Sequence, residues 1–140
     1  MNRAERRREL KRMQKQAAAG ARRDANDGGA LEAARQVLED AKRLHNSGKR
    51  SEAVSIYKEI LSSIPNQPEV LHLLGIAVFQ EGKDLEAVEF LEKSIEFGPE
   101  RANVHNDLGN IYSKLAKFEK AIEQFRAAVA LQQNFANSYY

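Results

Sequence analysis

The chain has 140 residues, a net charge of +2 and no cysteine, which excludes disulfides, thiolate nucleophiles and thiolate metal sites. Hydrophobic residues make up 42% of the sequence, enough for one modest domain. No stretch approaches the roughly 18 consecutive apolar residues of a membrane span, and no apolar stretch follows the basic N-terminus as it would in a secretory signal. We therefore expect a cytoplasmic protein.

The first residues form a basic arm. Residues 1–23 carry nine basic and two acidic side chains, a net charge of +7, whereas the remainder carries 13 basic and 18 acidic side chains, a net charge of −5. The arm is rich in good helix formers, but Leu10 and Met13 are almost its only large apolar residues. Because two apolar residues are too few to bury a helix face, we expect the arm to be disordered or transiently helical.

Three roles suit this arm. It can be a flexible solubilising or targeting tail, it can bind nucleic acid or an anionic membrane surface, or it can bind an acidic protein. The first role is favoured over nucleic acid, because no aromatic residue lies among the cations to stack on bases.

The rest of the chain shows helical periodicity. Apolar residues recur at i, i+3, i+4 and i+7, which predicts helices of about 14 residues joined by short turns, and short turns make the paired helices antiparallel. The expected segments are a linker at 24–30, repeats at 31–66, 67–101 and 102–135, and the start of an incomplete fourth repeat at 136–140.

A period of 34 residues runs through these segments. It relates small residues to small residues and large ones to large ones, which is typical of a solenoid with one helix pair per repeat. The related positions are Gly48 and Gly82; Ala53, Ala87 and Ala121; Tyr57, Leu91 and Phe125; Gly75 and Gly109; and Pro65 and Pro99.

The second and third repeats resemble the tetratricopeptide repeat. Leu74-Gly75 followed by Val78, and Leu108-Gly109 followed by Tyr112, match the Leu-Gly-x-x-Tyr core of that motif. The resemblance implies an all-α fold, an α-solenoid of antiparallel helix pairs that winds into a superhelix. It also implies a protein–protein interaction module rather than an enzyme.

Small residues are expected where helices approach closely. Gly75 and Gly109 on the first helices should meet small residues such as Ala87 on the second helices, because a larger side chain would push the helices apart. Leu91 and Phe125 are expected to fill the gap to the following helix pair.

A narrower resemblance concerns the stretch from Pro68 to Gly75. It is similar to the early repeats of bacterial tetratricopeptide proteins that lead into a glycosyltransferase of the O-GlcNAc-transferase type, a sulfotransferase or a methyltransferase. This resemblance implies an alternative function, the substrate-recruiting N-terminal segment of a larger transferase. No catalytic domain lies within these 140 residues.

The resemblance also implies a concave groove lined by the first helix of each pair. Its amide and apolar side chains suit an extended peptide or a partner helix, whereas the alternative is a face that is simply solvated. A clamp for a C-terminal carboxylate is not favoured, because Lys42 can serve as one donor but the other clamp positions carry no cation. The predicted groove residues are Lys42, His45, His72, Ile76, Phe79, Asn103, Asn106, Asn110 and Ser113.

The three histidines do not form a metal motif. His45, His72 and His105 come from different predicted helices, without a cysteine or a pair of carboxylates at ligand spacing. His105 replaces a bulky packing residue and is expected in the core. We expect no catalytic residue, cofactor or metal in this chain.

Overall fold

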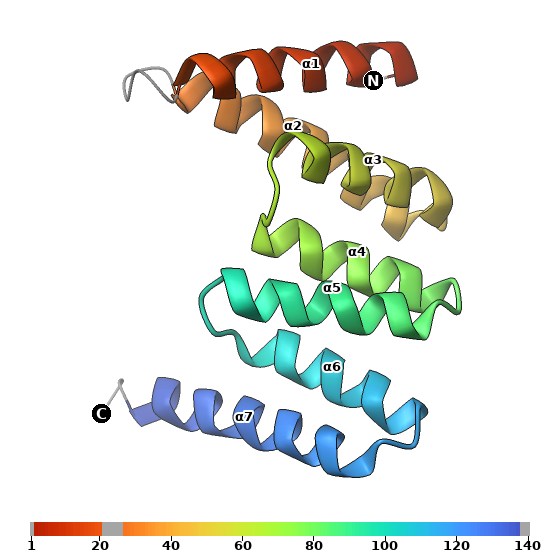
Figure 1. The fold of residues 1–140 in the computed structure, drawn as a ribbon, viewed down its shortest axis with the longest axis vertical. Coiled ribbons are helices and arrows are strands. Elements are labelled where there is room, and N and C mark those ends of the chain that lie inside the picture. Colours follow the sequence, from red (N-terminus) through yellow and green to blue (C-terminus); the bar gives the residue numbers. More distant parts are fainter. Residues whose placement is uncertain (1, 21–26, 138–140) are drawn as a thin grey trace. The chain divides into compact units, whose positions relative to one another are not determined.

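The computed structural model describes residues 2–20 and 27–137, and all regular structure within them is helical (Figure 1). The chain divides into two compact units, Met1–Pro65 and Asn66–Tyr140. Within each unit, helices separated by only three residues pack as antiparallel pairs, so the predicted fold class is confirmed. None of the helices in the described part of the chain is both long and apolar enough to cross a membrane.

The first unit contains α1 (Arg3–Gly20), α2 (Asp27–Asn46) and α3 (Arg50–Ser63). Helices α2 and α3 form the first antiparallel pair. Their shared core contains residues that are fully shielded from solvent, as the helical spacing of apolar residues predicts. These residues include Val37, Ala41, Ala53 and Tyr57.

Helix α1 differs from the expected arm. Arg3–Gly20 is one continuous helix that packs against both α2 and α3, so the prediction of a disordered or transiently helical segment is wrong for these residues. Leu10 and Met13 are 6% and 1% exposed. Two apolar residues suffice here because α2 and α3 supply the rest of the apolar surface.

Two predicted segment boundaries fall inside helices. Residues 27–30 of the expected linker belong to α2, and residues 136–137 of the expected fourth repeat belong to the last helix, α7 (Phe118–Asn137). The remaining parts of these segments, 24–26 and 138–140, lie outside the described residues, as do positions 21–23 of the predicted arm. The repeat boundaries themselves stay a prediction.

The second unit contains α4 (Pro68–Gln80), α5 (Asp84–Phe97), α6 (Ala102–Lys114) and α7. Helices α4 and α5 form one antiparallel pair and α6 and α7 the next, while α5 also packs on α6. The core is built from buried aliphatic residues of all four helices. They include Leu74, Val78, Leu91, Leu108, Ile111 and Ala128.

The glycines of the first helices lie at close helix contacts, as expected. A Cβ atom added to Gly109 would come within 2.6 Å of the Phe125 ring, and one added to Gly75 would lie 3.0 Å from the Leu91 side chain. The large side chains therefore fill the space left by the glycine of their own helix pair, whereas the sequence had placed Leu91 and Phe125 in the gap to the following pair. This contact sets how closely the two helices of a pair approach.

A second contact fastens α5 to the start of α4. The buried Ser94 hydroxyl donates a hydrogen bond of 2.8 Å to the Pro68 carbonyl oxygen. Beside it, a Cβ atom on Gly98 would lie only 2.5 Å from the Pro68 ring. Both small residues let the two helix ends meet.

The turns within the three pairs share one backbone geometry. At each turn a residue with positive φ follows the first helix: Gly48 at 90°, Gly82 at 88° and Ala116 at 60°. In the third turn the Lys117 amide donates to the Tyr112 carbonyl and the Ala116 amide to the Ser113 carbonyl, and equivalent bonds occur in the other two turns. This is the Schellman arrangement, which favours glycine at the left-handed position.

Ala116 occupies a position that glycine fills in the other two turns, and this difference gives a stability prediction. Ala116→Gly should raise the free energy of unfolding by about 0.5–1 kcal/mol, because it removes left-handed strain. Gly82→Ala should lower it by about 1–2 kcal/mol, although its new methyl group would meet no atom within 4 Å. Urea unfolding measures both, and Ala130→Gly in the exposed part of α7 is the control, expected to destabilise by about 1 kcal/mol. If Ala116→Gly destabilises the chain as much as Ala130→Gly does, Ala116 is not strained in the folded state.

Candidate peptide-binding face

Helices α4 and α6 contact each other directly in the second unit, and seven of the predicted groove residues lie on them. We call the surface that carries these residues the α4–α6 face. The spacing i, i+4, i+7 on α4 and i, i+3, i+7 on α6 places these residues on one side of each helix. It comprises His72, Ile76 and Phe79 on α4, and Asn103, Asn106, Asn110 and Ser113 on α6.

A hydrogen bond joins the two helices near the middle of this face. His72 Nε2 lies 2.7 Å from Asp107 Oδ2, with 12% of the His72 side chain and 32% of the Asp107 side chain exposed. The bond fixes the imidazole ring and occupies the carboxylate. His72 is therefore a partly buried structural contact as well as a member of the face.

A cation lies at the end of the face where α4 and α6 finish. Lys114 Nζ is 4.8 Å from the centre of the Phe79 ring and 3.3 Å from Asp84 Oδ1. An ammonium group over an aromatic ring is attracted by the ring's negative face. The contact orients the half-buried Phe79 ring and joins α4, α5 and α6 at this end.

The most exposed part of the face is a row of amides. Asn103, Asn106 and Asn110 are exposed on successive turns of α6, and half-buried Ile76 and Phe79 lie on α4. Each amide offers both donors and an acceptor, so a row of them can bond the backbone of an extended chain without reading its sequence. Half-buried Ile76 and Phe79 can then contact the side chains of the bound peptide.

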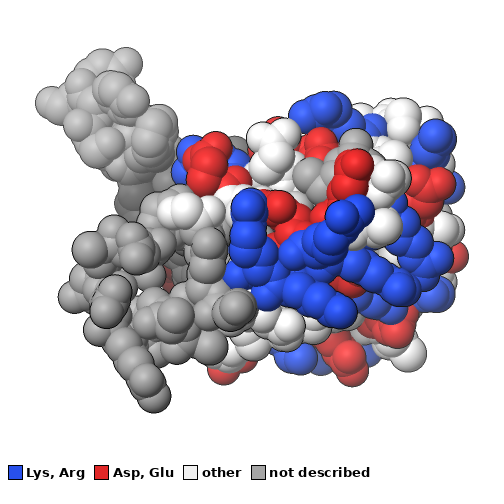
Figure 2. Space-filling view, turned by 90° about the horizontal axis from the view of Figure 1, so that it is seen from above, with Lys and Arg blue, Asp and Glu red and all other residues white. Residues whose placement is uncertain are grey.

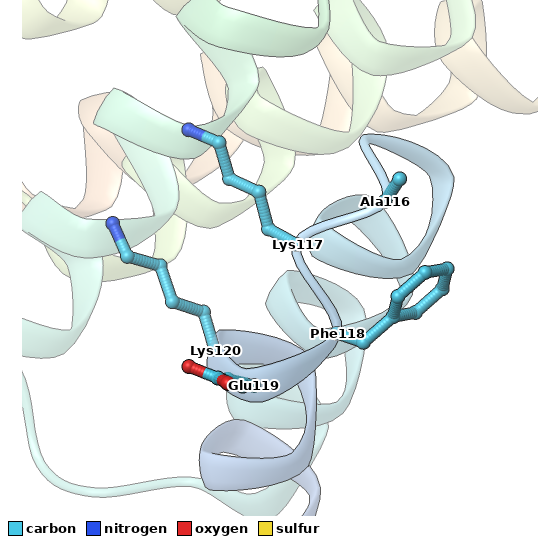
Figure 3. A pocket seen from close by; sticks show the side chains of 5 residues that line it. All are labelled: Ala116, Lys117, Phe118, Glu119 and Lys120. Carbon is cyan, nitrogen blue, oxygen red and sulfur yellow. The ribbon is translucent and has the colours of Figure 1, made fainter.

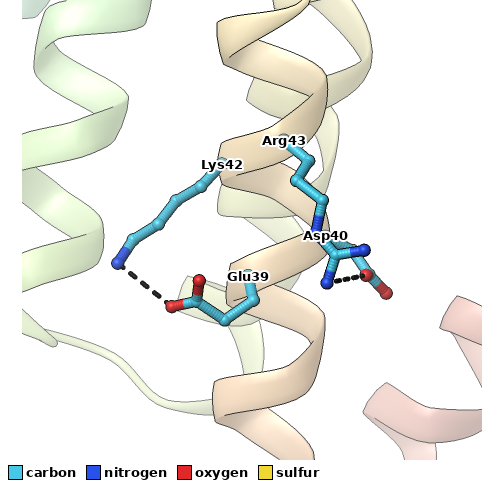
Figure 4. Close-up of polar contacts among 4 residues, drawn as sticks. All are labelled: Glu39, Asp40, Lys42 and Arg43. Atoms are coloured by element: carbon cyan, nitrogen blue, oxygen red, sulfur yellow. Dashed lines mark hydrogen bonds and ion pairs between the residues drawn. The ribbon is translucent and has the colours of Figure 1, made fainter.

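The two groove residues predicted in the first unit make contacts within that unit. Lys42 Nζ lies 3.3 Å from Glu39 Oε1, next to a second pair between Arg43 and Asp40 on the same helix (Figure 4). His45 Nδ1 lies 3.4 Å from the Tyr57 hydroxyl, and the two rings meet edge to face. Both residues therefore have partners on α2 or α3, and their role in ligand binding stays a prediction.

His105 lies in the core, as predicted. It is 9% exposed, and its Nδ1 atom lies 2.7 Å from Gln124 Oε1 on α7. Among the described residues, no group of three or more histidine, aspartate or glutamate side chains is arranged to hold a metal ion.

Sequence reasoning missed a hollow at the turn between α6 and α7. It has a volume of about 500 Å³ and is lined by the five residues from Ala116 to Lys120. Figure 3 shows the Lys117 and Lys120 side chains extending to one side and the Phe118 ring pointing away from them. Lys120 Nζ lies 5.7 Å from the Tyr112 ring centre. The titratable residues that line the hollow are two lysines, Lys117 and Lys120, and one carboxylate, Glu119.

Lys and Arg side chains gather over α1 (Figure 2). Because Leu10 and Met13 turn inward, the helical spacing directs most of the cations to solvent. The two acidic residues Glu5 and Glu9 lie on one flank of this surface, and Glu9 pairs with Arg12. The exposed cations are Arg3, Arg7, Arg8, Lys11 and Arg12.

Tyr112 joins α6 to α5. Its hydroxyl donates a hydrogen bond of 2.6 Å to Glu92 Oε1. Burial, the hydrogen bond to Glu92 and the nearby negative charges of Glu92 and Glu123 raise the pKa of Tyr112 from 10.0 to about 12.

This pKa shift predicts a pH dependence of stability. The folded chain holds the phenol proton more tightly than the unfolded chain, so the stabilisation by Tyr112 is complete below pH 10 and is lost as the pH rises toward about 12. Tyr112→Phe should lack this loss. Urea unfolding of the unmodified chain and of Tyr112→Phe between pH 10 and pH 12 measures the difference. All other titrating groups are common to the two proteins, so their contributions cancel. Stability curves that remain parallel up to pH 12 would contradict the assignment.

Comparison with known proteins identifies the segment that carries the amide row. Residues 102–135 match the family model described as tetratricopeptide repeat. This segment is a tetratricopeptide repeat. The matched residues cover α6 and most of α7.

Two curated relatives are longer proteins. The human cell division cycle protein 16 homolog is 30% identical over 105 residues, which cover 69% of this chain and 17% of that protein. Rat tetratricopeptide repeat protein 17 is 28% identical over 95 residues, covering 66% of this chain and 8% of that protein. The chain thus spans a small part of these relatives. Neither name indicates a glycosyltransferase, so the predicted resemblance to O-GlcNAc-transferase repeats is not supported by them.

Solved structures share the fold at low sequence identity. MamA aligns with a TM-score of 0.70 and 14% identity over 91% of this chain and 81% of its own. The second tetratricopeptide domain of RPAP3, bound to the HSP90 peptide SRMEEVD, aligns with a TM-score of 0.66 and 16% identity over 70% of this chain and 91% of its own. The helix pairs of this chain therefore have the tetratricopeptide-type fold.

Proposed function

We propose that this chain is a protein–protein interaction module that binds a peptide segment or a helix of a partner protein on the α4–α6 face. The observation that carries the proposal is the exposed row of Asn103, Asn106 and Asn110 beside half-buried Ile76 and Phe79. A structural relative that carries a bound peptide, the RPAP3 domain, supports it.

The chemistry of the face favours backbone recognition over recognition of a terminal carboxylate. The amides provide neutral donors and acceptors, whereas the Asp107 carboxylate would repel a second carboxylate. Lys114, a cation at one end of this face, already contacts Phe79 and Asp84. We therefore expect an internal peptide segment with an apolar side chain, and no requirement for a free C-terminus.

Selection from a peptide library displayed on phage tests the proposal. Peptides that bind the 140-residue chain should lose roughly tenfold or more in affinity with Phe79→Ala or with Asn106→Ala and Asn110→Ala combined, and should keep their affinity when their C-terminus is amidated. The matched control replaces two exposed residues on α5, Lys93→Ala and Glu96→Ala, and should change nothing. Equal losses in the control and the face variants, or none in either, would reject this face as the binding site.

Three narrower predictions remain without support from the relatives. They are the role as the substrate-recruiting segment of a transferase, the binding of nucleic acid or an anionic surface by α1, and the cytoplasmic location. The basic surface over α1 in Figure 2 is the feature on which the second one depends.

A further inference from the structure

The described part of α7 carries an exposed apolar stripe that no other described helix covers. Phe118, Ile122 and Val129 are 62%, 48% and 51% exposed, which is unusual for large apolar side chains clustered on one helix. Phe125, half-buried against Gly109, completes the stripe. Ile122, Phe125 and Val129 also line a hollow of about 310 Å³.

The spacing of these residues is that of a two-helix seam. The intervals along the chain are four, three and four residues, the repeat with which two helices pack side chains between each other over several turns. The stripe extends for about 17 Å along the helix. We call it the α7 seam.

Charges beside the seam indicate what covers it. Glu119 and Arg126 are two turns apart on the same flank, and both are exposed. When two copies of α7 run antiparallel about a two-fold axis, each copy's Glu119 faces Arg126 of the other. The same arrangement stacks Ile122 on Phe125 of the second copy and Phe118 on its Val129.

The opposite flank restricts the geometry. It carries Ala121 and Ala128, which are 2% and 5% exposed because they pack inside the unit. A parallel pair of helices would set the charged flank of one copy against this buried flank of the other, and would form no ion pair. Only the antiparallel arrangement satisfies both the apolar and the charged positions.

We propose that two copies of this chain associate through antiparallel α7 seams. The seam is one helix wide, smaller than the roughly 800 Å² per partner of a standard stable interface, so the dimer is weak and forms as concentration rises. The association closes at two copies, because both use the same surface.

Analytical ultracentrifugation of the full 140-residue chain over roughly a hundredfold range of concentration tests this proposal. The expected mass rises from 15.8 kDa toward twice that value. Ile122→Glu should remain monomeric. Leu85→Glu, at a position that is 68% exposed on α5, is the matched control and should dimerise like the unmodified chain.

A charge exchange tests the orientation without changing any apolar residue. Glu119→Arg alone should weaken association roughly tenfold, since it opposes two like charges at each end of the seam. Glu119→Arg combined with Arg126→Glu should restore it. Circular dichroism confirms that each variant is folded.

Three outcomes would overturn the proposal. A chain that stays monomeric over the whole range would assign the seam to another protein or another segment. Assemblies that grow beyond two copies would exclude a closed two-fold contact. If the variant with both Glu119→Arg and Arg126→Glu associates no more tightly than Glu119→Arg alone, the antiparallel pairing is excluded.

Discussion

The structure of the second unit depends on how closely the two helices of a pair approach at one glycine. At Gly109 a methyl group would force the Phe125 ring to move, because an added Cβ atom would lie only 2.6 Å from the ring. The ring thus lies against the backbone of α6 and excludes solvent from the pair. Gly75 and Leu91 repeat the contact in the preceding pair with a more adaptable side chain.

This packing has consequences for the candidate site. Because α6 is held closely against α7 and α5, its outer face is presented at a fixed position beside α4. Asp107 then reaches His72, and Lys114 reaches Phe79. The amide row on α6 therefore rests on a rigid support, which reduces the entropy that a bound peptide must overcome. Association through the α7 seam would leave this face free and would present two copies of it together.

Much of the fold could be predicted from the sequence because the repeat places small and large residues at fixed intervals. The helix pairs, the close approach at Gly75 and Gly109 and the burial of His105 followed from that register, whereas the large side chains that meet the two glycines did not. The helix at the N-terminus did not, because Leu10 and Met13 are too few to indicate a buried face unless the surface they cover is known. The left-handed backbone of Ala116 in the third turn could not be predicted either, because an alanine side chain gives no sign of it.

The candidate site was less predictable than the fold. The α4–α6 face stays a prediction, because the spacing of its residues along each helix does not fix which side chains meet across it. His72 and Asp107 are 35 residues apart, and their contact depends on side-chain directions that no local pattern fixes. The contact of His45 with Tyr57 could not be predicted for the same reason.

A double-mutant cycle between Gly109 and Phe125 tests the central packing claim most directly. Alanine is favoured over glycine in a helix by about 1 kcal/mol, so any loss of stability in Gly109→Ala must come from the clash with the ring. Gly109→Ala should lower the free energy of unfolding by about 1–3 kcal/mol. In a chain that already carries Phe125→Leu, the same substitution should cost at least about 1 kcal/mol less. If the double variant loses the sum of the two single losses, to within about 0.5 kcal/mol, the Phe125 ring does not limit the approach at Gly109.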